Sequence, residues 1–423
     1  MNDTQLKNAL ESGAMDSTLA ELYQDVDAAR KRYVAAIDLF TGLFGAKDDV
    51  HIFSAPGRTE VGGNHTDHQH GMVLAASVNL DTIAVVAARD DNEVQLHSEG
   101  YTPMRFTLDD LEVDELAYGT TPALIKGVAA GMQKHGYKTG GFCAYVTSQV
   151  LNGAGMSSSA AFEALTGAIF NGLYNDNAMD AQLNAQIGQY AENVYFGKPC
   201  GLMDQMACSV GGFVHIDFKD PAHPVVEPIA LDMTGEGYSL CIVDTKGSHA
   251  DLTGEYAAIP AEMKAVAECF GKEVMREVAK DEFMAKMPEL RDKVGDRALL
   301  RAYHFLKENA RVQDEADALK EGRFEDFLEL VKASGNSSYK FLQNIYANQD
   351  AAHQAMSLAL AVSEDALEGR GVCRVHGGGF AGTIQAFVKT EAVEDYNKVI
   401  EHLFGEGTCH VLMIRPKGAI QIA

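Results

Sequence analysis

The segment 153–161 combines residue types that bind phosphate groups. Its sequence, Gly-Ala-Gly-Met-Ser-Ser-Ser-Ala-Ala, follows an alternating apolar stretch over 142–150 and precedes apolar residues spaced by three and four from Phe162 to Leu173. The alternation predicts a strand and the spacing predicts a helix. Glycines let backbone N–H groups approach a ligand, and a helix N-terminus carries unpaired donors with partial positive charge. The segment therefore predicts a phosphate-binding loop; the alternative is an ordinary serine N-cap after a turn.

The densest polar cluster of the chain lies between Gly57 and Gly71. It reads Gly-Arg-Thr-Glu-Val-Gly-Gly-Asn-His-Thr-Asp-His-Gln-His-Gly and follows a predicted strand over 50–53. The cluster is predicted to be an irregular loop. Its acids and amides suit paired hydroxyl groups, so we expect it to bind a sugar or polyol. Two alternatives stay open, a metal site made by its histidines and aspartate, and an exposed polar turn.

Asp204 is the candidate catalytic residue, because the segment 192–205 ends a predicted helical stretch and places this acid in a turn constrained by glycines and a proline. A carboxylate in such a turn can accept a proton from a substrate hydroxyl, and the alternative is a helix cap. Another glycine-rich turn, 377–382, is predicted between strands, where positive φ or a nearby ligand requires glycine; a tight hairpin is the alternative. The chain has no P-loop sequence, so bound ATP would be held in another way.

Hydrophobic periodicity predicts the elements that position these residues. Spacings of three and four from Leu19 to Phe44 predict one or two amphipathic helices that end near Gly45 and pack on their own domain. Strands over 82–88, 94–97 and 104–107 are predicted to form a meander, and 261–365 is predicted to be mostly helical. Further strands are predicted over 213–216, 240–243, 372–375, 383–388 and 410–414.

The chain is predicted to be an α+β protein with two domains. Prolines 221, 224 and 228 mark the predicted boundary. We expect 1–45 to be an N-terminal helical extension packed on the first domain, 46–220 to be the first domain with both loops, and 221–423 to be the second.

Composition excludes some classes of partner. Lys and Arg number 35 against 60 Asp and Glu, which gives a net charge of −25 and argues against nucleic-acid or anionic-membrane surfaces. The first residues lack a basic and an apolar signal region, and no apolar run approaches the length that spans a bilayer. Seven scattered cysteines without a CxxC pair predict a reduced, cytoplasmic protein without a structural zinc site.

Four motifs, in this order and at these separations, resemble the GHMP small-molecule kinases and, within them, the galactokinases. The resemblance covers roughly residues 32–420. The matching segments are 57–67 (Gly-Arg-x-x-x-x-Gly-x-His-Thr-Asp), 153–160 (Gly-x-Gly-hydrophobic-Ser-Ser-Ser-Ala), 199–205 (Pro-Cys-Gly-x-Met-Asp-Gln) and 377–382 (Gly-Gly-Gly-Phe-x-Gly).

The resemblance implies a fold and an activity. The fold is the two-domain GHMP kinase fold, with a mixed β-sheet in the N-terminal domain, a helix-rich α/β C-terminal domain and the active site in the cleft between them. The activity is ATP-dependent phosphorylation of the anomeric hydroxyl of a sugar, with Mg²⁺. The partners are then a small sugar and ATP, and the chain is expected to be a monomer or a weak homo-oligomer.

The resemblance also implies residue roles. Asp204 accepts or polarises the hydroxyl proton, and Arg58 keeps Asp204 ionised and stabilises developing negative charge. The positions that match sugar contacts are Asn64, His65, Asp67, Gly201 and Tyr256. The positions that match phosphate contacts are Gly153, Gly155, Ser157, Ser158, Ser159 and Ala160, and the positions that match magnesium ligands are Ser159 and Glu192.

Asn64 departs from the pattern, because galactokinases usually carry Glu there and that acid contacts the C6 hydroxyl. Asparagine keeps an acceptor, adds two donors and loses the charge. Galactose, converted to galactose 1-phosphate, is therefore the first predicted substrate. A relative such as galacturonate or N-acetylgalactosamine is the alternative, because an amide does not repel a C6 carboxylate. A non-catalytic sugar sensor of the same family is a further alternative, which the presence of Ser159 and Asp204 disfavours.

Overall fold

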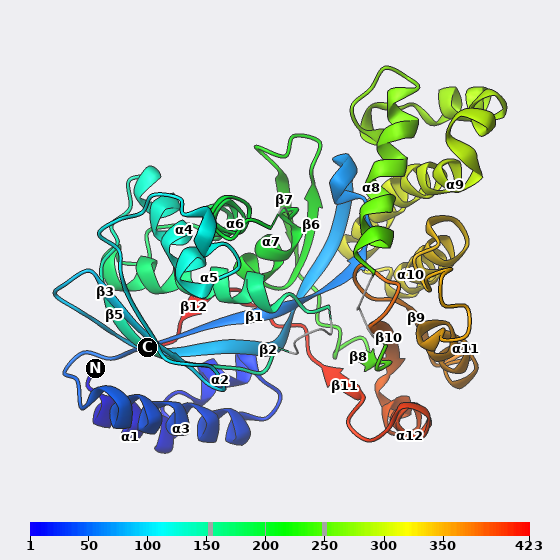
Figure 1. The fold of residues 1–423 in the computed structure, drawn as a ribbon. Helices are drawn as coiled ribbons and strands as arrows, with labels where there is room; N and C mark the ends of the chain where they lie inside the picture. The colour runs from blue at the N-terminus through cyan, green and yellow to red at the C-terminus, as the bar shows by residue number, and fades with distance from the viewer. Residues whose placement is uncertain (151–154, 199, 248–251) are drawn as a thin grey trace.

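The first half of the protein is built on a mixed eight-stranded sheet. The computed structural model describes residues 1–150, 155–198, 200–247 and 252–423. The strands run in the order β12-β1-β2-β5-β3-β4, and β6 pairs with β2 and with β7 (Figure 1). Their bounds are β1 (His51–Gly62), β2 (Met72–Ala88), β3 (Glu93–Ser98), β4 (Met104–Thr107), β5 (Phe142–Ser148), β6 (Phe213–Asp217), β7 (Val225–Ile229) and β12 (Ile420–Gln421).

The strand order corrects two expectations. β5 lies between β2 and β3 and pairs in parallel with β3, so 82–107 is not a meander, although β3 and β4 do form a hairpin. β1 continues through residue 62, so the first six residues of the polar cluster from Gly57 belong to a strand and not to a loop. The sequence pattern did not indicate this strand. Both faces of β1 are covered by protein, and such a strand lacks the alternation of polar and apolar residues that marks a half-exposed one.

Helices cover both faces of this sheet. Side chains alternate across a strand, so Ile83 and Val85 of β2 pack against the N-terminal helices, whereas Ala84 and Val86 pack toward the opposite helical layer. In Figure 1 the N-terminal helices lie below the sheet and the others above it. The two sets are α1 (Asp3–Glu11), α2 (Asp16–Leu22) and α3 (Val26–Phe44), and α4 (Thr121–Lys134), α5 (Ser158–Tyr174), α6 (Ala181–Tyr190) and α7 (Met203–Val210).

The second half combines a four-stranded antiparallel sheet with long helices. The strand order is β11-β8-β10-β9, and the predicted strands of this region are confirmed with small shifts of their ends. The region 261–365 is mostly helical, as predicted. The elements are β8 (Tyr238–Asp244), β9 (Gly371–Val375), β10 (Thr383–Lys389), β11 (Cys409–Leu412), α8 (Thr253–Glu268), α9 (Lys280–Lys320), α10 (Phe324–Ser337), α11 (Ala355–Ala366) and α12 (Val393–Phe404).

Short helical turns complete the secondary structure. One of them, the π-helical turn η3, carries Glu192, and another, η1, carries Asp67. Their bounds are η1 (Asp67–Gln69), η2 (Glu115–Ala117), η3 (Ala191–Tyr195), η4 (Met275–Glu277), η5 (Ser338–Leu342) and η6 (Thr390–Ala392).

The fold is α+β, with two sheet-centred parts as predicted. Two strands beyond residue 220, β7 and β12, pair with the first sheet, so the chain returns to its first half at its end. The Ala423 carbonyl accepts a hydrogen bond from the Ile52 N–H at 2.9 Å. The exact division at 45/46 and 220/221 stays a prediction.

A buried ion cluster joins the N-terminal helices, the first sheet and the C-terminal segment. Asp81 of β2 is completely buried and accepts hydrogen bonds from Arg32 of α3 at 2.5 Å and from Arg415 at 2.9 Å. The hydroxyls of Tyr23 and Ser54 also donate to its carboxylate. The N-terminal extension thus contributes both an apolar layer and a counter-charge to the first sheet.

The described part of the chain contains no candidate membrane-spanning helix. Each helix in the described part of the chain is too short or too polar to cross a bilayer.

Candidate active site

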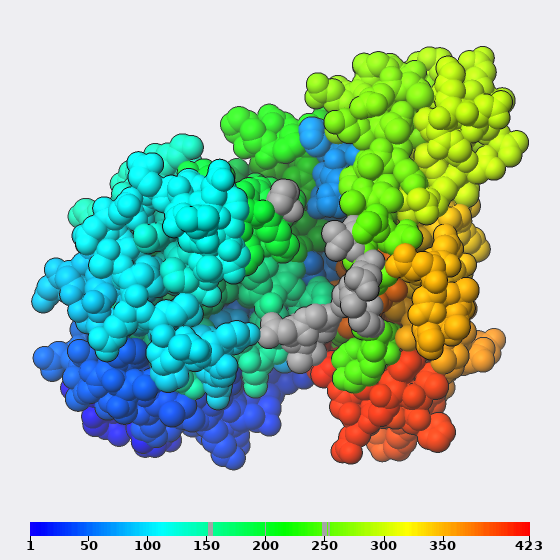
Figure 2. Space-filling model, viewed as in Figure 1, coloured from blue at the N-terminus to red at the C-terminus, as the bar shows by residue number. Residues whose placement is uncertain are grey.

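Several of the predicted site residues meet in a cleft between the two halves. Figure 2 shows the surface hollowed between the N-terminal half and the C-terminal half. A cavity of about 400 Å³ lies there. Six predicted site residues line it, namely Arg58, His65, Asp67, Gly201, Asp204 and Tyr256.

Arg58 and Asp204 form a two-point ion pair at one end of this cavity. Arg58 Nε donates to Asp204 Oδ1 at 2.7 Å, and Nη2 donates to Oδ2 at 2.9 Å. Burial opposes ionisation of Asp204, but the Arg58 guanidinium and the Ser157 hydroxyl hold the pKa of this carboxyl below its ordinary value. Asp204 is therefore an ionised acceptor at neutral pH. It lies in the first turn of α7, where no side-chain cap bond from Asp204 is formed.

The serine loop approaches the same aspartate. Ser157 occupies the N-cap position of α5 with φ 55°, yet its hydroxyl donates to Asp204 and accepts no capping hydrogen bond from a backbone N–H of the helix. This arrangement contradicts the ordinary N-cap alternative, and the first N–H groups of α5 are left to other acceptors. Gly155, with φ +68°, accepts a hydrogen bond from Arg58 through its carbonyl. The predicted phosphate contact Gly153 lies outside the described residues.

The two predicted magnesium ligands lie side by side. Ser159 Oγ, in the first turn of α5, is 3.3 Å from Glu192 Oε1 of η3. Glu192 is buried, and its other oxygen accepts a hydrogen bond from Gln205 Nε2 at 2.8 Å. Lys198 donates to Glu192 Oε1 at 2.8 Å and also lines the cavity. Sequence reasoning assigned no role to Lys198, although a lysine in a glycine- and proline-rich turn was the available signal.

The residues predicted to contact a sugar come from separate elements. Burial and the neighbouring His68 lower the pKa of His65 to about 4, so its ring is neutral and its Nε2–H donates to the Gly378 carbonyl at 2.9 Å. Gly201 faces Asp67 so closely that a Cβ at residue 201 would lie 2.4 Å from a carboxylate oxygen. Tyr256 of α8 donates to the Gly379 carbonyl at 2.7 Å. Protein atoms therefore orient each of these groups before a ligand arrives.

The glycine-rich turn after β9 closes the cavity from the second half. Gly377 and Gly378 line it. Gly379 has φ +86°, and a Cβ there would lie 2.0 Å from the Asn344 carbonyl oxygen. The prediction that this turn needs positive φ is confirmed, and glycine is required at position 379 on both grounds.

Asn64 lies behind the cavity wall and does not line it. The side chain is completely buried, and its Nδ2 donates to Glu60 Oε1 and to the Gly377 carbonyl, each at 2.8 Å. Its Oδ1 accepts from Asn344 at 2.8 Å and from Ser338 at 3.2 Å. The structure thus does not bring this predicted contact residue to the cavity, because the amide is saturated by protein partners.

Glu60, which sequence reasoning passed over, lines the cavity instead. Burial raises the pKa of Glu60 to about 7, against the opposing effect of Arg374. The residue was missed because the polar cluster was treated as a loop. In a strand, alternate side chains share a face, so Arg58 and Glu60 point the same way.

A further cavity, of about 410 Å³, adjoins the serine loop. Ser158 and Ser159 form its edge. Its apolar walls come from five elements and from Phe196, which follows η3, so no local sequence pattern marks it. They include Leu96, Met104, Leu124, Val146, Phe162 and Phe196.

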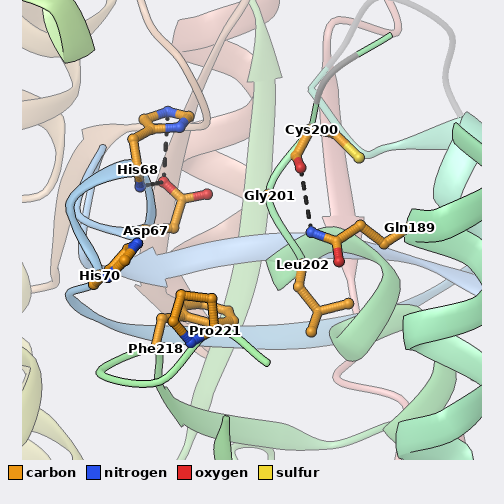
Figure 3. A pocket seen from close by; sticks show the side chains of 9 residues that line it. All are labelled: Asp67, His68, His70, Gln189, Cys200, Gly201, Leu202, Phe218 and Pro221. Atoms are coloured by element: carbon orange, nitrogen blue, oxygen red, sulfur yellow. Dashed lines mark hydrogen bonds and ion pairs between the residues drawn. The ribbon is translucent and has the colours of Figure 1, made fainter. Parts of the chain in front are cut away.

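A side cavity of about 360 Å³ adjoins the cavity that Arg58 and Asp204 line, with Asp67, His68, Cys200 and Gly201 as shared walls. Figure 3 shows the remaining lining, in which Gln189 Nε2 donates to the Cys200 carbonyl at 3.2 Å. The rest of this lining combines two polar and three apolar side chains, His70, Gln189, Leu202, Phe218 and Pro221.

The histidine-rich metal site, an alternative for the polar cluster, finds no support in this geometry. Among the described residues, no group of three or more His, Cys, Asp or Glu side chains is arranged to hold a metal ion. His65 is already directed to a backbone carbonyl.

Comparisons with known proteins agree with this geometry. Residues 38–88 match the galactokinase galactose-binding signature, and residues 123–212 match the N-terminal domain of GHMP kinases. The chain is 31% identical over 371 residues to a galactokinase of Streptomyces coelicolor, a match that covers 86% of this chain and 91% of that protein.

Solved structures give the same relationship. The crystal structure of Lactococcus lactis galactokinase complexed with galactose has a TM-score of 0.77 and 25% identity, and the match covers 92% of this chain and 99% of that chain. Methanococcus jannaschii mevalonate kinase has a TM-score of 0.60 at 15% identity, with 87% and 99% covered. The second likeness concerns the fold alone.

Proposed function

Because the chain belongs to the galactokinase family of GHMP kinases, we propose that it transfers a phosphoryl group from ATP to the anomeric hydroxyl of galactose. The observation that carries this proposal is the Arg58–Asp204 pair, which lies in one cleft with the serine loop and the sugar-facing residues. The product is galactose 1-phosphate.

The Arg58–Asp204 pair supports a simple chemical role. Phosphoryl transfer depends on positioning and charge stabilisation more than on covalent help from the protein. Asp204, kept ionised by Arg58, accepts a hydrogen bond from the reacting hydroxyl and takes or polarises its proton. Arg58 remains beside the new negative charge.

The nucleotide is proposed to bind across α5. The first N–H groups of α5, with Gly155, Ser157, Ser158, Ser159 and Ala160, are proposed to face the phosphates. The apolar cavity beside Ser158 and Ser159 suits the base.

Ser159 and Glu192 fit Mg²⁺, because two hard oxygen donors lie 3.3 Å apart and Mg²⁺ is commonly held by one or two such groups together with phosphates. Bound there, Mg²⁺ neutralises phosphate charge. Lys198, already paired with Glu192, adds a second positive group at the same edge of the cavity.

A kinase assay tests the proposal. ADP release is measured with galactose, glucose, galacturonate and N-acetylgalactosamine, and we expect galactose to have the highest kcat/KM. Asp204→Asn should lower kcat by at least about a hundredfold while the Kd for ATP, measured by calorimetry, stays unchanged. Near-normal turnover of this variant would remove Asp204 from the mechanism, and turnover without any sugar preference would argue against a galactose kinase.

The side cavity favours one second candidate, a galactose relative with a larger substituent. An acetamido group offers a methyl group for the apolar walls and a carbonyl for His70 or Gln189, so N-acetylgalactosamine is the relative that this cavity suits. The same substrate panel separates it from galactose.

The cellular setting is proposed to be the cytoplasm. All seven cysteines are free thiols, which suits a reducing compartment. A monomer or weak homo-oligomer stays a prediction.

A further inference from the structure

Glu60 and Arg58 stand side by side on one face of β1. The β1–β2 pairing is regular from Arg58, opposite Ser77, to Glu60, opposite Ala75. Residues two apart on a strand share a face and lie about 6.6 Å apart along it. Both line the cavity. Glu60 therefore lies about one sugar ring away from the end of the cavity where Arg58 binds Asp204.

One oxygen of Glu60 is held by the protein and the other is not. Oε1 accepts hydrogen bonds from Asn64 Nδ2 at 2.8 Å and from Arg374 Nη2 at 3.1 Å. In the part of the chain that the structure describes, no hydrogen bond reaches Oε2. The backbone carbonyl of Glu60 is also fixed, because Gln385 Nε2 donates to it at 2.6 Å. A rigid carboxyl group thus directs one unused acceptor at the cavity.

We propose that Glu60 determines specificity by accepting a hydrogen bond from one hydroxyl of the sugar other than the reacting one. This inference rests on the proposed function. The free Oε2 at this position selects a sugar that places a hydroxyl donor against it. The carboxyl group absent from position 64 is supplied by Glu60, its hydrogen-bonded neighbour.

Deoxygenated sugars test this contact. The kcat/KM of the wild-type protein is measured with galactose and with its 2-, 3-, 4- and 6-deoxy analogues, and the series is repeated with Glu60→Gln. Glutamine keeps the size of the side chain, and its amide oxygen can still accept from Asn64 and Arg374. We expect loss of one particular hydroxyl to cost the wild type at least about tenfold. In Glu60→Gln that penalty should largely disappear, and the other penalties should remain.

Glu315→Gln is the matched control. Glu315 is buried, and neither of its carboxyl oxygens has a hydrogen-bond partner among the described residues. Burial raises its pKa well above the ordinary value, which favours the neutral form that glutamine resembles in size and shape. It does not line the cavity, and the control should keep the wild-type pattern.

The outcomes separate this inference from the proposed function. If Glu60→Gln shows the same fall in kcat/KM as the wild type with each of the four deoxy analogues, the inference is overturned, while galactose phosphorylation stands. Absence of galactose phosphorylation by the wild type would overturn both. If Glu60→Gln does not fold, Glu60→Asp replaces it, since it keeps a carboxyl group on the side of Arg374 and withdraws the acceptor by one methylene. For Glu60→Asp too, we expect removal of that one hydroxyl to lower kcat/KM much less than in the wild type.

Discussion

The ionised state of one carboxyl group, that of Asp204, depends most on one guanidinium, that of Arg58. Arg58 and the Ser157 hydroxyl hold the pKa of Asp204 below its ordinary value against the effect of burial. Removing the positive charge must therefore raise this pKa. A protonated Asp204 cannot accept the hydroxyl proton, so activity would then be lost at a higher pH than in the wild type.

Arg58→Gln tests this dependence. We expect the acid limb of kcat/KM to move to higher pH, together with a lower maximum. Arg58→Lys is the control, because it keeps the charge but loses the two-point geometry, and its acid limb should move less. Steady-state kinetics across pH measure both limbs. An unshifted limb in Arg58→Gln would show that Arg58 does not control the ionisation of Asp204.

Site residues could be predicted where several polar side chains lie close together in one segment of the sequence. Arg58, His65 and Asp67 follow from one polar cluster, and Asp204 from a constrained turn. The contrast between Glu60 and Asn64 was not predictable, because both are polar and only the strand pairing of β1 decides which faces the cavity. The apolar cavity beside Ser158 was hidden for a different reason, since its walls come from many elements.

Among the elements, β2 depends on a charge buried between α3 and the C-terminal segment. Burial opposes ionisation of Asp81, but Arg32 and Arg415 hold its pKa below the ordinary value of 3.8. A depressed pKa means that the folded state binds the proton less readily than the unfolded chain. The stabilisation is therefore complete above about pH 4 and is lost as pH falls through the folded-state pKa.

Asp81→Asn should lower the free energy of unfolding by about 3–5 kcal/mol, because two arginines are left without their buried counter-charge. Urea denaturation at pH 7 measures the change. Asp91→Asn is the control, since Asp91 pairs with Arg89 on the surface with 55% of its side chain exposed, and it should change stability little. Equal effects of the two substitutions would contradict the role assigned to Asp81.

Element prediction succeeded where periodicity was local. The strand over 104–107 and the helices that end at Gly45 match the sequence pattern. The meander prediction was wrong, because the insertion of β5 between β2 and β3 is a long-range pairing that no pattern within 82–107 contains. Pro228, taken as a sign of a boundary, lies in β7 at the edge of the sheet, where a missing N–H is tolerated.

Across the complete chain, the first sheet depends on residues from both ends. β12 pairs with β1, and Arg415 reaches Asp81. A fragment of residues 1–247 lacks both, so we expect it to show no cooperative unfolding transition, whereas the full chain shows one. Circular dichroism during thermal denaturation tests this, with the full chain as the control. A fragment that melts cooperatively would show that the first half is independent of the C-terminal segment.

The return of the C-terminus to β1 also has a consequence for synthesis. Phe53 of β1 is made early, and its partner Gln421 of β12 is made much later. On the ribosome the nascent chain must hold an unfinished sheet edge, with Asp81 short of one arginine, until residues 415–421 have left the exit tunnel. The emergence of this segment is thus the step that completes the first sheet, and a translation product truncated before it would keep that edge open to aggregation.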